Sequence, residues 1–271
     1  MVSSRWVELE GAENVRDLGG LPTTDGRVVQ PHRLIRSDSL QALTDDDVRF
    51  LVDDLRVRSV ADLRTGVEVT SEGPGPMTRE TEVEVRHLSL FPEAGDNTDA
   101  MAAEEADAPV VLPWQNRERP ASEDERRHGA SGVYLGYLDD RGDSIIDALR
   151  LIAGSDGATV VHCAAGKDRT GVVIAFALAE VGVERQAIVD DYALSGERID
   201  AILDRLSSRR TYATDLGGAE VDADRHKPRA ATMQRLLDAM DEFHGGIPAW
   251  LRANGWTERD AAALRAKLLE P

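Results

Sequence analysis

A ten-residue segment between two apolar stretches constrains this chain more than any other feature. Residues 158–161 read Ala-Thr-Val-Val, which predicts a short buried strand, and residues 171–181 are apolar enough to predict a central helix. The segment that joins them, residues 162–171, reads His-Cys-Ala-Ala-Gly-Lys-Asp-Arg-Thr-Gly. A loop that opens a helix directs several backbone N–H groups and the positive end of the helix dipole at one point. The segment therefore predicts an anion-binding loop.

The side chains of this loop suit a phosphate group. Ala164, Ala165 and Gly166 are small enough to let the backbone curl tightly around an anion. Arg169 offers a planar fork of donors that matches two phosphate oxygens. The spacing is not that of a nucleotide-binding Walker loop, because Val161 occupies the position of the first glycine of that motif. We expect the loop amides and Arg169 to bind phosphate.

Cys163 is the single cysteine of the 271-residue chain. One cysteine excludes an internal disulfide and a cysteine-rich zinc site, and its ordinary interpretation is a small buried hydrophobic residue. Its neighbours favour a reactive thiol instead, because a helix N-terminus and Arg169 both stabilise a thiolate. We expect His162 to orient the loop by donating hydrogen bonds to its carbonyl groups. We also expect the Thr170 hydroxyl to donate to the sulfur and favour its departure.

The remaining elements alternate in type early in the chain and are helical late. Early on, we expect a helix at 44–55 and strands at 57–63 and 81–90. Later helices are expected at 131–152, where Gly142 can break the helix, and at 185–194, 198–208, 228–243 and 257–269. This order predicts an α/β fold with a central, mostly parallel sheet, flanking helices and a helical C-terminal part.

A segment at about 92–128 differs in composition from the rest of the chain. It is rich in Asp, Glu, Ala and Pro and has few periodic apolar positions. We expect it to be a variable insertion, part disordered and part mobile lid, within a single domain that spans residues 1–271.

The formal net charge of −18 limits the expected partners. An acidic surface repels nucleic acid and anionic membranes, so neither is an expected partner. It also repels phosphorylated molecules at long range, so a phosphate site must supply its own positive potential. No stretch is apolar enough to span a membrane and no apolar signal segment begins the chain, so we expect a cytoplasmic protein.

The loop at 162–171 resembles the signature of the cysteine-dependent protein tyrosine phosphatases. It is most similar to the bacterial branch of dual- and triple-specificity enzymes with a Gly-Lys-Asp-Arg-Thr-Gly loop. Further segments similar to that branch cover most of the chain, namely 14–20, 34–37, 62–65 with Glu68, and 188–192. In the first of these, Asn14, Arg16 and Asp17 are expected to tie the N-terminal stretch to the core.

The resemblance implies a tyrosine-phosphatase-like fold and a two-step reaction without metal or cofactor. Cys163 attacks phosphorus while Arg169 and the loop amides hold the oxygens, and water then hydrolyses the cysteinyl-phosphate. The expected substrates are phosphotyrosine proteins, with dual or triple specificity as an extension.

Three carboxylic acids are candidates for protonating the leaving oxygen. Asp168 ranks first, because the resemblance places an aspartate at this position of the loop, beside the phosphate. Glu93 follows a Phe-Pro pair where a relative carries an aspartate. Asp62 is expected to brace Arg64 as an ion pair, and Arg64 to hold the loop or contact substrate.

Other interpretations of the same loop remain open. A phosphoinositide phosphatase of the same mechanism is favoured by Lys167, which adds charge for a polyphosphorylated head group. A phosphate-binding module without turnover is opposed by the joint presence of Cys163, Arg169 and Asp168. A rhodanese-type sulfur carrier also has a cysteine loop after a strand, but it does not require the Arg-Thr-Gly continuation. The sequence leaves the oligomeric state and the physiological substrate open.

Overall fold

The computed structural model describes residues 5–92, 112, 130–212, 216 and 222–270. The insertion expected at about 92–128 therefore lies almost wholly outside the described residues, and so does Glu93.

Five strands form one mixed sheet in the order β1-β2-β5-β3-β4. Their bounds are β1 Arg16–Asp17, β2 Leu34–Ser37, β3 Val57–Asp62, β4 Glu84–His87 and β5 Ala158–His162. β1 runs antiparallel to β2, and the other three pairs are parallel. The expected mostly parallel central sheet is confirmed, and β5 is its middle strand.

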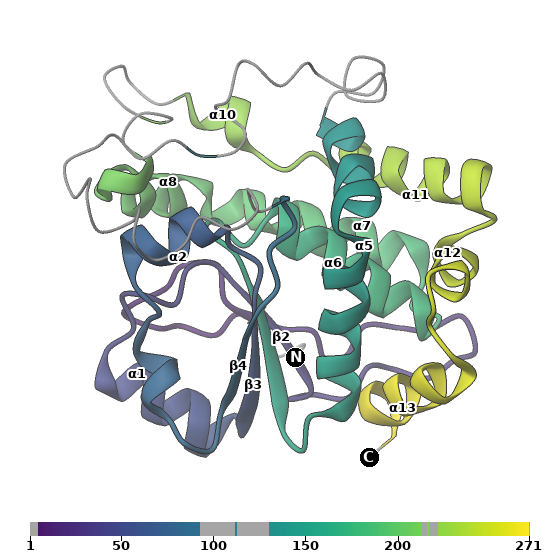
Figure 1. Cartoon of the computed structure of the whole chain (residues 1–271), viewed down its shortest axis with the longest axis horizontal. Coiled ribbons are helices and arrows are strands. Elements are labelled where there is room, and N and C mark those ends of the chain that lie inside the picture. The colour runs from purple at the N-terminus through teal and green to yellow at the C-terminus, as the bar shows by residue number, and fades with distance from the viewer. Residues whose placement is uncertain (1–4, 93–111, 113–129, 213–215, 217–221, 271) are drawn as a thin grey trace.

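Helices cover both faces of the sheet (Figure 1). The α-helices are α1 Asp45–Arg49, α2 Gly66–Glu72, α5 Ala130–Gly154, α6 Asp168–Glu180, α7 Arg185–Leu194, α8 Ile199–Ser207, α10 Ala223–His226, α11 Ala230–His244, α12 Ile247–Ala253 and α13 Glu258–Leu269. Shorter helical turns of other types are η1 Phe50–Asp54, η2 Pro76–Arg79, η4 Ser195–Arg198 and η5 Arg210–Tyr212. In the described part of the chain, no helix combines the length and apolarity that crossing a membrane requires.

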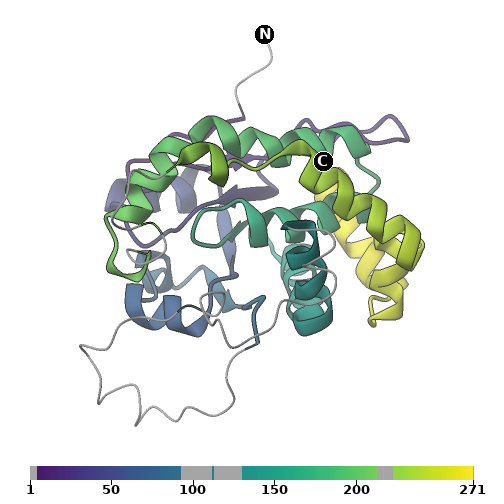
Figure 2. The ribbon, with the colours of Figure 1, turned by 90° about the horizontal axis from the view of Figure 1, so that it is seen from above.

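Figures 1 and 2 both show α11, α12 and α13 gathered at one end of the molecule, beside α5 and α6. α8 and α10 lie across the carboxyl end of the parallel strands (Figure 1).

Two hydrophobic clusters fill the two faces of the sheet. On one face, Ile152 of α5 and Phe176 of α6 belong to the larger cluster, which includes Val161. On the other face, Leu51 packs in a smaller cluster with Val160. Successive residues of a strand point to opposite faces, which is why adjacent valines of β5 belong to different clusters. The middle strand is thus held on both sides, and so is the loop that follows it.

The helix expected at 171–181 begins three residues earlier than predicted. α6 starts at Asp168, because the N–H of Gly171 already donates to the carbonyl of Lys167 at 2.9 Å. Arg169 therefore lies in the first helical turn, where the N–H groups have no intrahelical acceptor.

Two other expectations need adjustment. The helix expected at 44–55 is α1 followed by the π-helical turn η1. The helix expected at 131–152 is one element, α5, but Arg141 leaves the helical conformation with φ −141° and ψ 41°. The kink therefore lies one residue before Gly142.

α2 was not expected, although its start has a sequence signal. Thr65 and Glu68 form a capping box, in which the Thr65 hydroxyl accepts from the Glu68 N–H at 3.1 Å and a Glu68 carboxylate oxygen accepts from the Thr65 N–H at 2.7 Å. This Thr-x-x-Glu pattern is a recognised helix start. It also fixes the place of the Glu68 carboxylate.

Candidate active site

The loop between β5 and α6 lies at the carboxyl end of the parallel strands, where open α/β sheets bind ligands. Its own carbonyl groups are held from outside. The N–H of Ser39 donates to the carbonyl of Ala164 at 3.0 Å. The side-chain amide of Asn14 donates to the carbonyl of Ala165, also at 3.0 Å.

The carbonyls of Cys163 and Gly166, which flank those of Ala164 and Ala165, have partners as well. Nη2 of Arg36 donates to the carbonyl of Gly166 at 2.6 Å. Nδ1 of His162 lies 3.3 Å from the carbonyl oxygen of Cys163, which is the loop-orienting contact expected of this histidine.

Four consecutive carbonyls are therefore turned outward. In a planar trans peptide the C=O and the following N–H point in opposite directions. The N–H groups of residues 164–167 accordingly face away from these outer donors, and they make no hydrogen bond to any described residue. A concave row of unsatisfied N–H groups at a helix N-terminus binds anions.

Gly166 is required by the shape of the loop. Its φ is +67°, and a Cβ atom there would lie 2.5 Å from the carbonyl oxygen of Ser37. Both the left-handed conformation and the close approach of two backbones favour glycine.

A buried ion cluster supports the loop from behind. Asp191 of α7 accepts from Arg16 at 3.1 Å and from Arg36 at 2.7 Å, and Arg5 also contacts it at 2.9 Å. Burial acts to raise the pKa of Asp191, but the neighbouring arginines outweigh burial and lower it. Arg16 also donates to the side-chain oxygen of Asn14 at 2.6 Å. The N-terminal stretch is thereby linked to the loop as well as to the core.

Arg169 is held by a carboxylate. Its Nη1 and Nη2 donate to the two oxygens of Glu68 at 2.5 and 2.8 Å, and Nη1 also donates to the carbonyl of Leu63 at 3.2 Å. Burial acts to raise the pKa of Glu68, but Arg169 outweighs it and the pKa is lowered. Tyr212 donates to the same carboxylate at 2.9 Å. This two-pronged contact fixes the plane of the guanidinium beside the loop.

Cys163 is buried, with 2% of its surface exposed. Thr170, the residue expected to assist the sulfur, has a buried hydroxyl with no hydrogen-bond partner in the described part of the chain. That hydroxyl is consistent with a donor reserved for the sulfur or for a ligand.

Asp168 and Lys167 contact each other at the edge of the loop. Nζ of Lys167 lies 3.3 Å from Oδ2 of Asp168 and donates to the carbonyl of His226 at 2.9 Å. The hydroxyl of Tyr134 donates to Oδ1 of Asp168. Burial acts to raise the pKa of Asp168, but Lys167 and Tyr134 outweigh it, and the pKa lies below its usual value.

Asp62 and Arg64 form the expected ion pair. Nε and Nη2 of Arg64 donate to the Asp62 carboxylate at 2.9 and 2.6 Å, and both side chains are buried. Nε2 of His162 lies 3.6 Å from Oδ1 of Asp62. Burial lowers the pKa of His162, although the nearby Asp62 carboxylate acts in the opposite direction. Asp62 braces its neighbours and does not line the cavity described next.

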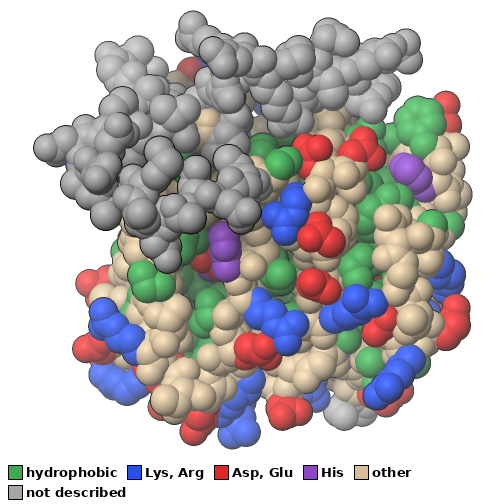
Figure 3. All heavy atoms as spheres, viewed as in Figure 1, with side chains coloured by type: hydrophobic (Ala, Val, Ile, Leu, Met, Phe, Trp, Pro, Cys, Tyr) green, Lys and Arg blue, Asp and Glu red, His purple; other side chains and the backbone are tan. Residues whose placement is uncertain are grey.

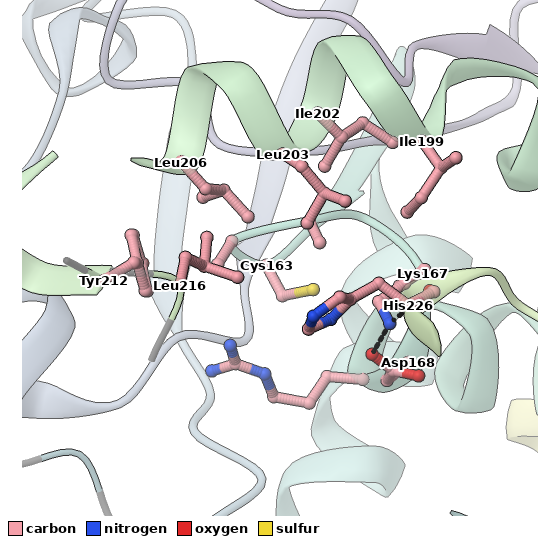
Figure 4. Close-up of a pocket in the computed structure, with 13 residues that line it drawn as sticks. Cys163, Lys167, Asp168, Ile199, Ile202, Leu203, Leu206, Tyr212, Leu216 and His226 are labelled. Atoms are coloured by element: carbon pink, nitrogen blue, oxygen red, sulfur yellow. Dashed lines mark hydrogen bonds and ion pairs between the residues drawn. The ribbon is translucent and has the colours of Figure 1, made fainter. Parts of the chain in front are cut away.

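A cavity of about 330 Å³ opens above the loop (Figure 4). Its floor is formed by the loop and the start of α6, including Cys163, Lys167, Asp168 and Arg169. Its opposite wall is apolar and comes mostly from α8, with Ile199, Ile202, Leu203, Leu206, Tyr212 and Leu216. His226 of α10 completes the lining, and Figure 4 shows its imidazole directed into the cavity. Among the described residues, no cluster of three or more His, Cys, Asp or Glu could hold a metal ion.

The sequence analysis did not single out several residues of this site. Three of them, Glu68, Arg36 and Asp191, lie in segments that resemble the family. The sequence analysis assigned these three residues no role, because their partners are distant in sequence. Tyr134 and His226 had no recognisable signal, because neither stands in a motif.

Comparison with known proteins covers nearly the whole chain. Residues 7–270 match the model of a family described as the tyrosine phosphatase family. The chain is 28% identical over 288 residues to the triple specificity protein phosphatase PtpB of Mycobacterium tuberculosis, covering 97% of this chain and 98% of the relative. It is 26% identical over 250 residues to a tyrosine-protein phosphatase of Nostoc commune, covering 91% and 78%. Among solved structures, the Siw14 catalytic core aligns with 93% of this chain and 98% of its own, at 13% identity and a TM-score of 0.41.

Proposed function

The chain belongs to the tyrosine phosphatase family, and from that premise we propose that Cys163 is the nucleophile, Arg169 the phosphate ligand and Asp168 the proton donor. The protein is a phosphatase, a hydrolase of phosphate monoesters. The observation that supports the residue assignment is that four loop carbonyls have partners outside the loop, while the N–H groups of residues 164–167, which follow Cys163, have none among the described residues.

In the first step, the sulfur of Cys163 attacks phosphorus while the loop amides and Arg169 hold the three non-bridging oxygens. The sulfur–phosphorus bond forms and the phosphorus–oxygen bond to the leaving group breaks. Asp168 donates its proton to the leaving oxygen.

In the second step, water attacks the cysteinyl-phosphate. Asp168, now a carboxylate, accepts a proton from the water, and the bond between phosphorus and Cys163 breaks. The buried hydroxyl of Thr170 donates to the departing thiolate. Inorganic phosphate is released and the thiolate is restored.

Asp168 must gain a proton before the first step. In the substrate-free structure Lys167 and Tyr134 favour its carboxylate form. A phosphate ester bound in the loop brings negative charge close to Asp168, and a like charge raises the pKa of a carboxyl group. The bound substrate also competes with Asp168 for the ammonium of Lys167. Substrate binding thus favours the protonated acid.

The cavity favours phosphotyrosine over more polar esters. The apolar wall of α8, with Ile202 and Leu203, faces the phosphate floor, and an aromatic ring carried by the phosphate can pack against it. Phosphoinositides are the second candidate, because Lys167 also lines the cavity and can contact a further phosphate. On the face that Figure 3 draws, the described side chains of both charge signs are interspersed.

A substrate panel tests the proposal. Phosphotyrosine, phosphoserine and phosphothreonine peptides and phosphoinositides are assayed with the wild type and with Cys163→Ser, with and without a chelator. We expect phosphotyrosine to be hydrolysed most efficiently and the chelator to have no effect. Cys163→Ser should lose about a thousandfold or more in kcat while vanadate still binds, because a serine hydroxyl stays protonated in the same field. Turnover within tenfold of the wild type would sink the nucleophile assignment.

A further inference from the structure

A buried tyrosine contacts Asp168 from outside the cavity, and a second buried tyrosine contacts the first. Tyr134 of α5 is 2% exposed, and its hydroxyl donates to Oδ1 of Asp168. Tyr192 of α7 is also 2% exposed, and its hydroxyl oxygen lies 2.7 Å from that of Tyr134. The two rings meet edge to face with centroids 6.4 Å apart. Neither tyrosine lines the cavity.

The direction of these hydrogen bonds follows from the number of protons. A tyrosine hydroxyl carries one hydrogen, and Tyr134 gives its hydrogen to Asp168, so Tyr192 must donate to Tyr134. Burial raises the pKa of both tyrosines above the ordinary value, so both hydroxyls remain protonated at neutral pH. The result is a one-way chain of donors that ends on Oδ1.

Oδ2 of Asp168 has a different environment. Its described partner is the ammonium of Lys167 at 3.3 Å, on a flexible side chain that lines the cavity. The side chain of Asp168 is 35% exposed and lines the cavity as well. An ester oxygen in the cavity can therefore approach Oδ2, whereas Oδ1 is occupied by the buried hydroxyl of Tyr134.

We propose that Tyr134 is a positioning residue for the reaction, which holds Oδ1 of Asp168 as an acceptor and reserves Oδ2 for the transferred proton. This inference rests on the proposed role of Asp168 as proton donor. Tyr134 does not line the cavity, and it acts on the reaction through its hydrogen bond to Asp168. It fixes the rotation of the carboxyl group, so that the acidic proton faces the leaving oxygen.

The proposal predicts the direction in which the pH profile of the reaction changes when Tyr134 is replaced. A hydroxyl that donates to a carboxylate stabilises the charged form and lowers the pKa of the acid. Its removal must therefore raise the pKa of Asp168. The other titratable groups around Asp168 are not replaced in a Tyr134 variant, and these are Cys163, Lys167 and Arg169 of the loop region, Tyr137 of α5, Tyr192 of α7 and His226 of α10.

The test compares the pH dependence of kcat for the full chain and for Tyr134→Phe. Phenyl phosphate requires protonation of its leaving oxygen, and 2,4-dinitrophenyl phosphate does not. In the wild type, kcat for phenyl phosphate should fall on the basic side as Asp168 loses its proton. In Tyr134→Phe this basic limb should move to higher pH by about one unit, the worth of one hydrogen bond to a charged group. Rates with dinitrophenyl phosphate should stay within about twofold.

A basic limb that stays in place in Tyr134→Phe overturns the proposal, whatever the loss in kcat, because a merely structural role lowers kcat at every pH alike. Tyr134→Met provides a second variant without the hydroxyl, and it must move the limb in the same direction. Thermal unfolding shows whether either variant is folded. Tyr192→Phe keeps the bond from Tyr134 to Asp168, so its shift should be less than half as large, and an equal shift overturns the assignment to Tyr134.

Asp168→Asn separates this inference from the proposed function. The basic limb for phenyl phosphate should be absent in this variant. If the limb persists, Asp168 is not the proton donor and the proposed function fails at that residue. If the limb disappears in Asp168→Asn but does not move in Tyr134→Phe, the proton donor stands and only the positioning role is overturned.

Discussion

Arg36 donates a hydrogen bond from Nη2 to the carbonyl oxygen of Gly166 at 2.6 Å and from Nη1 to Asp191 at 2.7 Å. One fully buried guanidinium thus joins the back of the loop to the ion cluster of α7. The contact holds a carbonyl outward and with it the N–H of Lys167 inward. It also places a positive charge behind the anion site of a chain whose net charge is −18.

Arg36→Met should therefore lower kcat/KM by about 10- to 100-fold, the value of one charge-assisted hydrogen bond to the loop. The dissociation constant of vanadate should rise by a similar factor. Arg58→Met is a matched control, because Arg58 of β3 also donates to backbone carbonyls, those of Val52 and Val57, but away from the loop. If both variants behave alike, the contact from Arg36 to Gly166 has no special role.

The contact between Glu68 and Arg169 leads to a second prediction. Glu68→Gln keeps the shape of the side chain but removes the charge that fixes the guanidinium, and we expect a loss of about 10- to 100-fold in kcat/KM. Arg169→Lys should lose about a thousandfold or more, because an ammonium cannot make a two-pronged contact. Glu72→Gln is the control on the same helix, since Glu72 pairs with Arg209. Equal activity of Glu68→Gln and the wild type would place the clamp elsewhere.

The parts of this molecule that could be predicted from sequence are local in the chain. The loop from His162 to Gly171 is contiguous, and a strand before it and a helix after it determine most of its shape. The mostly parallel sheet and the family resemblance are confirmed. The Asp62 and Arg64 pair was also accessible, because its members are two residues apart.

The parts that could not be predicted depend on distant contacts. Glu68 and Arg169 are separated by 101 positions, and no pattern assigns a buried charge its partner. The amphipathic pattern of α8 predicts a helix, but it does not say that its apolar face covers the loop. Tyr134 has the spacing of an ordinary core residue, and only its hydroxyl, which the pattern cannot place, connects it to Asp168.

A third prediction concerns the proton donor. Asp168→Asn should slow phenyl phosphate far more than 2,4-dinitrophenyl phosphate, because only the poorer leaving group needs a proton in the transition state. The ratio of the two kcat/KM values measures the effect directly, because kcat/KM excludes the second step, which is the same for both substrates, and we expect this ratio to change by about 100-fold. Equal slowing of both substrates would indicate a structural role. Glu93→Gln is then assayed in the same way, as the next acid in order.

A fourth prediction concerns stability and pH. The arginines around Asp191 lower its pKa in the folded state, so its contribution to stability is fully present above its unfolded pKa of about 4 and is lost as pH falls below that value. Asp191→Asn should cost about 3–5 kcal/mol at pH 7, because it leaves Arg16 and Arg36 buried without a counter-charge.

Urea unfolding at pH 7 and at pH 3.5 measures this contribution, and the gap between the wild type and Asp191→Asn should be smaller at the lower pH. Asp190→Asn changes the exposed neighbour on the same helix and should stay within about 0.5 kcal/mol of the wild type. A gap for Asp191→Asn that is the same at both pH values would contradict the assigned pKa direction.

The last prediction decides between the two substrate classes through Lys167. Its ammonium contacts Asp168 and the carbonyl of His226 in the substrate-free structure, and it lines the cavity. If the cavity accepts an inositol ring with several phosphates, the Lys167 ammonium can exchange its contacts with Asp168 and His226 for a contact with a second phosphate. Lys167→Ala should then reduce phosphoinositide hydrolysis by about tenfold more than phosphotyrosine hydrolysis, since one partly exposed charge contact is worth about a kcal/mol.

Lys227→Ala is the control, because Lys227 is exposed near the same segment and does not line the cavity. Matched losses on both substrates, at one fixed ionic strength, would reject the second phosphate contact. The apolar wall of α8 would then be the dominant specificity element, and it favours an aromatic ester.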